Sequence, residues 1–198
     1  IIEISEKKDI ITILDDAHGD FVLGRDGRGT ANFFNVEKKI DLYISSLSKG
    51  LGSFGGYVCG KSNLIDLCIN TSKTFIYTSA LPASINQYSL QRFNSNREAY
   101  RRKLWNKINQ FHDRLNEIGF KTTSTSQIIP IIIGDEKKAM DFSKFLKSEG
   151  IFAQAIRYPT VKKNQARIRI SITGWLSEKD IEYSIKILEK AKRKFDLK

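Results

Sequence analysis

Two short apolar, β-branched segments constrain the fold most, because each one ends in a cluster of polar residues. Residues 10–14 lead into Asp15 and Asp16, and residues 41–45 lead into a run of serine, lysine and glycine. Segments of this length and composition are typical of buried strands. In α/β sheets, ligands bind beyond the carboxyl ends of the strands. The sequence therefore predicts an α/β fold with a functional site where these two segments end.

The rest of the chain alternates between further predicted strands and amphipathic helices. Residues 1–8 have the pattern of a helix end, and we predict one long helical stretch over residues 83–118, with Gly119 as its stop. Strands are predicted at 55–60, 128–133, 152–157 and 167–173, and helices at 63–70, 136–149 and 177–195. From this order we predict two domains, a three-layer α/β part over residues 1–98 and a smaller α+β domain over residues 99–198.

The net charge of +11 raises the possibility of nucleic-acid binding. The basic residues are densest in residues 97–107 and 189–198, where helical spacing places them on solvated faces among acidic residues. No zinc-finger, RNP or helix-turn-helix pattern accompanies them. We therefore expect no nucleic-acid partner, and a basic surface would equally attract a small anionic substrate such as a coenzyme A thioester.

Composition also bears on location and on metal chemistry. The sequence has no apolar run of 18 residues and no signal-peptide pattern, so we expect a cytoplasmic protein with no membrane segment. Cys59 and Cys68 stand in apolar surroundings without the spacing of a metal site, which predicts buried free thiols and no metal. Because the sequence opens at Ile1 inside a helix-like pattern, we also expect it to be part of a longer polypeptide.

The segment SSLSKGLGSFGG, residues 45–56, is the more informative of the two polar clusters. A lysine just past a strand end, flanked by hydroxyls and glycines, can form a Schiff base with a cofactor carbonyl. Free N–H groups and hydroxyls in such a loop suit a phosphate. Lys49 precedes the glycines, so the segment does not fit the NTP-binding P-loop pattern, and a plain glycine-rich connector remains the alternative.

The other cluster, DDAHG at residues 15–19, places a histidine three residues after a strand-end carboxylate. Such a pair can hold a charged heterocycle, although an ordinary strand-end turn has the same composition. Together the two clusters supply a lysine for an aldehyde, a carboxylate for a pyridine nitrogen and donors for a phosphate, which are the groups that pyridoxal phosphate needs.

The chain resembles the α-oxoamine synthases in five segments that follow one another in order. They are LDDAHGDFVLGRDGRGT (14–30), SSLSKGLGSFGGYVCG (45–60), FIYTSALPA (75–83), AIRYPTV (155–161) and QARIRISIT (165–173). This family consists of pyridoxal-phosphate enzymes of fold type I, the aspartate aminotransferase-like fold, which join an amino acid to an acyl-CoA with loss of carbon dioxide. The resemblance implies a PLP-dependent acyltransferase. Residues 1–98 would be the second half of its large, cofactor-binding domain, and residues 99–198 its C-terminal domain.

The resemblance also implies roles at the cofactor. Asp15 would pair with the pyridinium nitrogen, His18 would hydrogen-bond the ring oxygen, and Lys49 would carry the cofactor as a Schiff base. Ser46 matches the position that contacts the phosphate, with Ser48 as an alternative.

Two further residues, Thr78 and Ser79, match a stretch that reaches the phosphate of the neighbouring subunit in this family. Their presence implies a homodimer with shared active sites.

For the substrate, the resemblance points to the C-terminal part of the chain. Arg169 matches the arginine that binds the substrate carboxylate, and a guanidinium can do so with two hydrogen bonds. Thr160 belongs to the loop before that strand and is expected near the substrate. Arg167, two residues earlier on the same strand face, is as consistent with a surface charge as with a function. The Lys162–Asn164 stretch departs from the proline and glycine usual in the family, which leaves the local loop geometry open.

The AIR-x-PTV segment is most similar to the branch that condenses L-alanine with pimeloyl-CoA, or with a pimeloyl carrier protein, in biotin biosynthesis. Branches that use glycine or serine share the same motifs and remain alternatives. A non-catalytic partner subunit is a further alternative, but such a subunit is expected to lose the Schiff-base lysine, and Lys49 is present.

Overall fold

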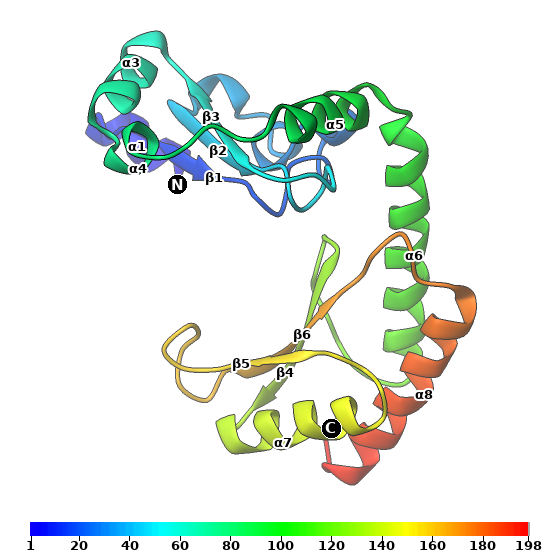
Figure 1. Cartoon of the computed structure of the whole chain (residues 1–198). Coiled ribbons are helices and arrows are strands. Elements are labelled where there is room, and N and C mark those ends of the chain that lie inside the picture. Colours follow the sequence, from blue (N-terminus) through cyan, green and yellow to red (C-terminus); the bar gives the residue numbers. More distant parts are fainter. Residues whose placement is uncertain (198) are drawn as a thin grey trace. The chain divides into compact units, whose positions relative to one another are not determined.

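The computed structural model describes residues 1–197 of the chain, which form two compact units that divide between residues 101 and 102. The division lies inside helix α6 (Arg97–Glu117), three residues beyond the domain boundary expected from the sequence. Each unit has its own sheet, and the strands of the two sheets do not pair with each other (Figure 1).

The first unit is built on a three-stranded sheet in the order β1-β2-β3. Its strands are β1 (Ile13–Asp15), β2 (Leu42–Ser46) and β3 (Gly56–Gly60). β1 runs parallel to β2, and β3 runs antiparallel to it. The helices of this unit are α1 (Ile2–Lys8), α2 (Thr30–Phe33), α3 (Ser62–Thr71), α4 (Lys73–Ile76) and α5 (Ala83–Asn94), with 3-10 turns η1 (Arg25–Gly27) and η2 (Glu37–Lys39).

The apolar side chains of this sheet are less buried than the sequence predicts. Ile13 of β1 is 61% exposed, and the exposed large side chains of the unit include Val58. The prediction of buried free thiols is wrong, because Cys59 is exposed and Cys68 is half-buried. Cys59 is exposed because it lies on β3, a strand at the edge of this sheet.

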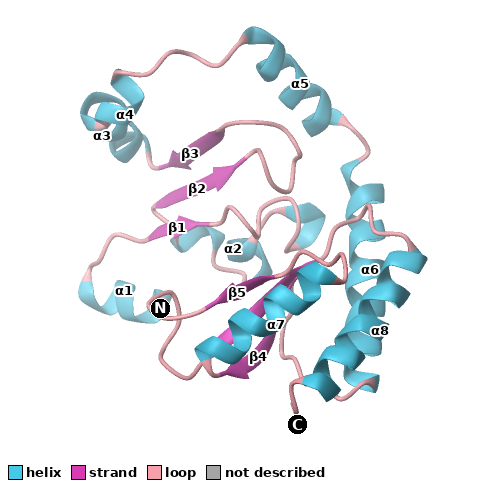
Figure 2. Cartoon of the chain, turned by 60° about the horizontal axis from the view of Figure 1, so that its bottom comes forward, coloured by secondary structure: helices cyan, strands magenta, loops and turns pink. Residues whose placement is uncertain are grey.

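The second unit is an antiparallel sheet with helices packed on it. The sheet order is β4-β6-β5, with β4 (Ile128–Gly134), β5 (Gln154–Ile156) and β6 (Ala166–Ser171). Helix α7 (Glu136–Ser148) contacts all three strands and also contacts α8 (Glu178–Lys194). Figure 2 shows α8 running beside α6, where Glu178 of α8 accepts hydrogen bonds from Lys107 and Gln110 of α6. The buried side chains between these elements form one apolar cluster.

The long helix predicted over residues 83–118 is two helices, α5 and α6. Ser95 is in an extended conformation, and its Oγ donates to the carbonyl of Arg92 at 2.7 Å. The side chain of Asn96 then accepts the amide of Ala99 at 3.2 Å, which caps the start of α6. Among the described residues, no helix is long and apolar enough to cross a membrane.

Candidate active site

The polar residues that follow β1 and β2 lie at one edge of the first sheet. In the parallel pairing Asp15 stands opposite Ile44, so Asp15 and Ser46 end neighbouring strands on the same side. Asp15 is exposed, and its carboxylate accepts the amide of Ala17 at 3.1 Å. The prediction that the two strands belong to one sheet is therefore confirmed, and their carboxyl ends meet where ligands bind in such sheets.

A tight turn after β1 carries His18. The amides of Gly19 and Asp20 both donate to the carbonyl of Asp16 at 2.9 Å, and His18 lies exposed inside the turn. A Cβ atom at position 19 would stand 2.1 Å from the Asp16 side chain, so only glycine fits there. The turn fixes Asp15 and His18 at the same edge.

Asp16 is a buried carboxylate that holds this turn to the rest of the unit. It is 3% exposed and accepts three hydrogen bonds, from the amide of Thr30 at 2.6 Å, the hydroxyl of Thr30 at 2.5 Å and the hydroxyl of Tyr43 at 2.8 Å. Burial, and then the hydrogen bond to Asp16, raise the pKa of Tyr43 well above its usual value. The carboxylate thus joins the turn to the start of α2 and to β2.

Asp20 is a second buried carboxylate at the other end of the turn. Its Oδ2 accepts the hydroxyls of Ser45 and Tyr57, each at 2.6 Å. Burial, and then the hydrogen bond to Asp20, raise the pKa of Tyr57. The rings of Tyr43 and Tyr57 lie 6.2 Å apart on neighbouring strands, so the two carboxylates share one side of the sheet.

The loop after β2 presents Lys49 to solvent. The hydroxyls of Ser46 and Ser48 lie 2.7 Å apart, and the amide of Ser48 donates to Ser46 Oγ at 3.3 Å. Lys49 and Ser48 are exposed, whereas Ser46 is half-buried. The amide of Gly52 donates to the carbonyl of Lys49 at 3.0 Å and closes a turn in which Gly52 has a φ of +70°. The structure thus brings Lys49, both serines and Asp15 to the same edge of the sheet.

Helix α5 anchors the far side of this loop. Leu51 is buried, and its carbonyl accepts the Nε of Arg92 at 3.4 Å. The hydroxyls of Ser53 and Ser89 lie 2.7 Å apart. These contacts fix the loop without engaging the side chain of Lys49.

Thr78 and Ser79 lie in the exposed segment between α4 and α5. Like Lys49, they belong to the first unit. The resemblance, however, implies that they contact the cofactor phosphate of the neighbouring subunit and not that of their own. That role stays a prediction.

In the second unit, Arg167 and Arg169 point to the same face of β6, opposite to the buried Ala166 and Ile168. Both arginines line a cavity of about 500 Å³ whose wall also includes the hydroxyl-rich residues 123–126. Arg169 is half-buried between Pro130 of β4 and Gln154 of β5 in the sheet register, whereas the guanidinium of Arg167 donates to the carbonyl of Gln165 at 3.1 Å.

Thr160 is exposed in the turn that precedes β6, where the amide of Val161 donates to the carbonyl of Arg157 at 3.3 Å. It is not among the residues that line the arginine cavity. Its expected place near the substrate stays a prediction.

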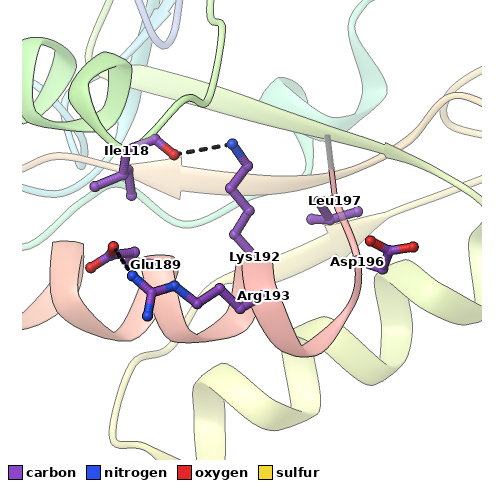
Figure 3. Close-up of a pocket in the computed structure, with 6 residues that line it drawn as sticks. All are labelled: Ile118, Glu189, Lys192, Arg193, Asp196 and Leu197. Carbon is purple, nitrogen blue, oxygen red and sulfur yellow. Dashed lines mark hydrogen bonds and ion pairs between the residues drawn. The ribbon is translucent and has the colours of Figure 1, made fainter.

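A smaller cavity of about 270 Å³ at the C-terminal end of α8 has a structural explanation (Figure 3). The ammonium of Lys192 donates to the carbonyls of Ile118 and Gly119 at 3.1 and 3.0 Å. A cation at the carbonyl end of a helix satisfies acceptors that have no partner within the helix. This lysine therefore caps α6.

The sequence did not single out the residues that hold the site in place, which are Asp16, Asp20, Thr30, Tyr43, Ser45 and Tyr57. Strand alternation carried part of the signal, since Tyr43 and Ser45 are two residues apart on β2 and share a face. The partners of Asp20 are 25 and 37 residues away in the chain, a distance at which spacing gives no information.

The whole arrangement defines a class of protein. The chain matches the family model described as Aminotransferase class I and II over residues 1–188, and it belongs to that family. Curated relatives named 8-amino-7-oxononanoate synthase align with 96–100% of this chain. The protein from Thermoanaerobacter pseudethanolicus is 41% identical over 200 residues, with 100% of this chain and 51% of that protein aligned. The protein from Petrotoga mobilis is 38% identical over 193 residues, with 96% of this chain and 49% of that protein aligned.

Solved structures show the same fold. A serine palmitoyltransferase from S. paucimobilis has a TM-score of 0.88 at 21% identity, and it covers 100% of this chain and 51% of its own. An 8-amino-7-oxononanoate synthase from Francisella tularensis has a TM-score of 0.78 at 26% identity, covering 98% of this chain and 59% of its own. The expected fold type and the resemblance to the α-oxoamine synthases are confirmed. The chain spans about half the length of the curated relatives it matches.

Proposed function

We propose that this chain provides the cofactor-bearing lysine and the C-terminal domain of a PLP-dependent acyltransferase that makes 8-amino-7-oxononanoate from L-alanine and a pimeloyl thioester. The observation that carries the proposal is the parallel pairing of β1 and β2, because it sets Asp15 and the Lys49 loop at one sheet edge. The relatives at 41% and 38% identity support the choice of reaction.

The residues at this edge fit pyridoxal phosphate by their chemistry. The cofactor has an aldehyde, a pyridine nitrogen, a ring oxygen and a phosphate, and the edge offers an amine, a carboxylate, an imidazole and hydroxyls. Lys49 is exposed and the Gly52 turn beside it leaves open space, since a Cβ atom there would meet nothing within 4 Å. Bound pyridoxal phosphate would supply an electron sink that stabilises negative charge on the α-carbon of an amino acid.

Each side chain then has a defined task. Lys49 would hold the cofactor through its aldehyde, and the free amine of the same lysine would be the base that removes the α-proton of the amino acid. The carboxylate of Asp15 would keep the pyridine nitrogen protonated, and His18 would donate to the ring oxygen. Ser46 and Ser48 would donate to the phosphate.

Arg169 would bind the carboxylate of the amino acid. A guanidinium suits this task because it remains charged and presents two parallel N–H donors. We assign the carboxylate to Arg169 because this residue matches the family's arginine that binds the substrate carboxylate, and we give Arg167 no role at the substrate.

We also propose that the whole enzyme is a homodimer with shared active sites, in which Thr78 and Ser79 reach the phosphate of the neighbouring subunit. A mixed dimer tests this arrangement. A Lys49→Ala subunit paired with a Thr78→Ala, Ser79→Ala subunit should contain one fully intact site, and so recover activity that neither variant dimer has. No recovery in isolated mixed dimers would contradict shared sites.

The reaction is tested with the full-length protein by the release of coenzyme A from pimeloyl-CoA in the presence of L-alanine, glycine or L-serine. We expect alanine to be the preferred amino acid and Lys49→Ala to abolish the reaction. Lys73→Ala is the matched control, because Lys73 is an exposed lysine of the same unit at the start of α4.

The same assay with other acyl-CoA thioesters distinguishes the alternatives. Preference for glycine with acetyl-CoA would identify a 2-amino-3-ketobutyrate CoA ligase, glycine with succinyl-CoA a 5-aminolevulinate synthase, and serine with a long-chain acyl-CoA a serine palmitoyltransferase. Full activity of Lys49→Ala would contradict the proposal. No turnover of any pair would favour a non-catalytic partner subunit.

A further inference from the structure

The carboxylate of Asp20 lies between the turn that carries His18 and the loop that carries Lys49. It is 6% exposed. Its Oδ2 accepts the hydroxyls of Ser45 and Tyr57 at 2.6 Å each, and its Oδ1 accepts the amide of Phe21 at 3.1 Å. Hydrogen bonds to a charged acceptor are stronger than those between neutral groups, so this cluster is a strong connection between separate segments.

Asp20 contacts the chain on both sides of Lys49, at Ser45 and at Gly50. Ser45, which donates to the carboxylate, directly precedes Ser46 at the start of the loop. Gly50, which directly follows Lys49, packs so closely that an added Cβ atom would stand 2.5 Å from the carbonyl oxygen of Asp20. The segment between these two contacts contains Ser46, Ser48 and Lys49.

Asp20 also closes the turn on the other side. Its amide donates to the carbonyl of Asp16 at 2.9 Å, and this bond spans the residues on either side of His18. One residue therefore connects the backbone that bears His18 with the backbone that bears Lys49. Its side chain borders a cavity of about 630 Å³ that Arg28 and Arg97 also line.

We propose that Asp20 is a positioning residue that sets the Lys49 loop against the Asp15–His18 turn through Ser45 and Tyr57. The proposal rests on the proposed function, because it concerns the same site. Asp20 acts through its neighbours, since its carboxylate is occupied by donors of this chain. A displacement of about 1 Å in a reacting group can lower a rate by roughly a hundredfold, so a residue that fixes this distance matters for turnover.

The first test needs no cofactor. Amide hydrogen exchange is measured on the cofactor-free, full-length protein for wild type, Asp20→Ala, Asp20→Asn and Leu42→Ala. Leu42 is the matched control, because it is a buried residue at the opposite end of β2 from Ser46. We expect Asp20→Ala to speed exchange in residues 46–52 and in residues 17–20 together, Asp20→Asn to do so less, and Leu42→Ala to do neither. Unchanged exchange in residues 46–52 of Asp20→Ala would overturn the proposal.

The second test separates positioning from stability. Pyridoxal phosphate is added to each variant, the bond is trapped with borohydride, and the rate of labelling at Lys49 is followed by mass spectrometry beside kcat, KM and the thermal midpoint. We expect Asp20→Ala to lower both the labelling rate and kcat by roughly tenfold or more. Asp20→Asn should recover most of both, and Leu42→Ala should lose stability without losing either.

The outcomes distinguish this proposal from the proposed function. Equal losses of kcat in Asp20→Ala and Leu42→Ala at equal loss of stability would show a structural role and overturn positioning. Labelling of wild type at a lysine other than Lys49 would refute the proposed function and, with it, the role of Asp20 at that lysine. The exchange data would still decide whether Asp20 connects the two segments.

Discussion

Residues 102–197 surround an apolar core, whereas in residues 1–101 two buried carboxylates lie among only a few buried apolar side chains. The large apolar cluster of the chain lies wholly in the second unit, and its most buried members include Phe111, Phe142 and Leu115. In the first unit, Asp16 and Asp20 are as buried as the four buried apolar side chains, which are Val22, Ala31, Leu42 and Leu51. Apolar packing stabilises without direction, while buried hydrogen bonds fix positions. The unit that carries the candidate lysine is thus the one held by directional contacts.

The helix starts show a second difference between the two units. In the second unit, Asp135 caps α7 and Ser177 forms a capping box with Asp180 at the start of α8. The helices α1 to α5 of the first unit have no side-chain hydrogen bond at their N-caps. Helix caps and apolar packing therefore contribute more to the stability of the second unit than to that of the first.

The largest expected effect comes from the core of the second unit. Phe142→Ala in the 198-residue chain should lower the free energy of unfolding by about 3–5 kcal/mol, because Phe142 is fully buried and a cavity would remain. Trp105 and Trp175 both lie in this unit, so tryptophan fluorescence in denaturant follows its unfolding. Ile13→Ala, at an exposed strand position of the first unit, should change the free energy of unfolding of that unit by less than about 0.5 kcal/mol, as measured by circular dichroism in denaturant. Similar losses for the two variants would contradict the contrast between the units.

A buried carboxylate should matter next. Asp16→Ala leaves the amide and hydroxyl of Thr30 and the hydroxyl of Tyr43 without their acceptor, which should cost about 2–3 kcal/mol of stability in the first unit. Circular dichroism in denaturant measures this loss. The tryptophan fluorescence transition, which reports the second unit, should not change. The control is Asp66→Ala on the exposed side of α3, for which we expect almost no change. A loss confined to the fluorescence transition would argue against the assignment.

The helix caps give a smaller effect. Ser177→Ala removes the side chain that accepts the amide of Asp180, which should cost about 1 kcal/mol in the second unit. Ser72→Ala at the start of α4 should cost less than about 0.5 kcal/mol, because no side-chain cap is formed there. Equal costs at the two serines would remove the distinction between capped and uncapped helix starts.

The smallest effect is a dependence on pH in the first unit. A hydrogen bond from Lys61, followed by those from Thr12, lowers the pKa of Asp41 to about 2. Because this pKa is lower in the folded state than the ordinary value of 3.8, the contribution is fully present above about pH 4. It is lost as the pH falls towards 2. Asp41→Asn should therefore flatten the acid dependence of stability in this window, as measured by denaturant titrations at each pH. An unchanged acid slope in the variant would refute this role of Asp41.

Much of the fold was predictable because its signals are local. The strands at residues 41–45 and 55–60 and the helix that begins after Ser177 were expected from composition and capping, and the structure confirms them. The break between α5 and α6 was missed, because the amphipathic pattern continues through it. The pair Ser95 and Asn96, both suited to capping, was the available signal.

The candidate site also has a part that local sequence signals predict and a part that depends on tertiary contacts. The resemblance and the strand ends predict Asp15, Ser46 and Lys49 as site residues, and the parallel pairing of β1 with β2 places Asp15 and Ser46 at one edge of the sheet. The buried contacts of Asp20 join residues far apart in the chain, which only tertiary structure places together. The exposure of Cys59 was also unpredictable, since local apolar surroundings do not show which strand is at an edge.

The most direct test of the central claim is to map the lysine that bonds to the cofactor. The full-length protein is incubated with pyridoxal phosphate, reduced with borohydride and digested, and the labelled peptide is identified by mass spectrometry. The account predicts a single label on Lys49 that L-alanine displaces before reduction, and none in Lys49→Ala. A label on another lysine, or an active enzyme that carries none, would contradict it.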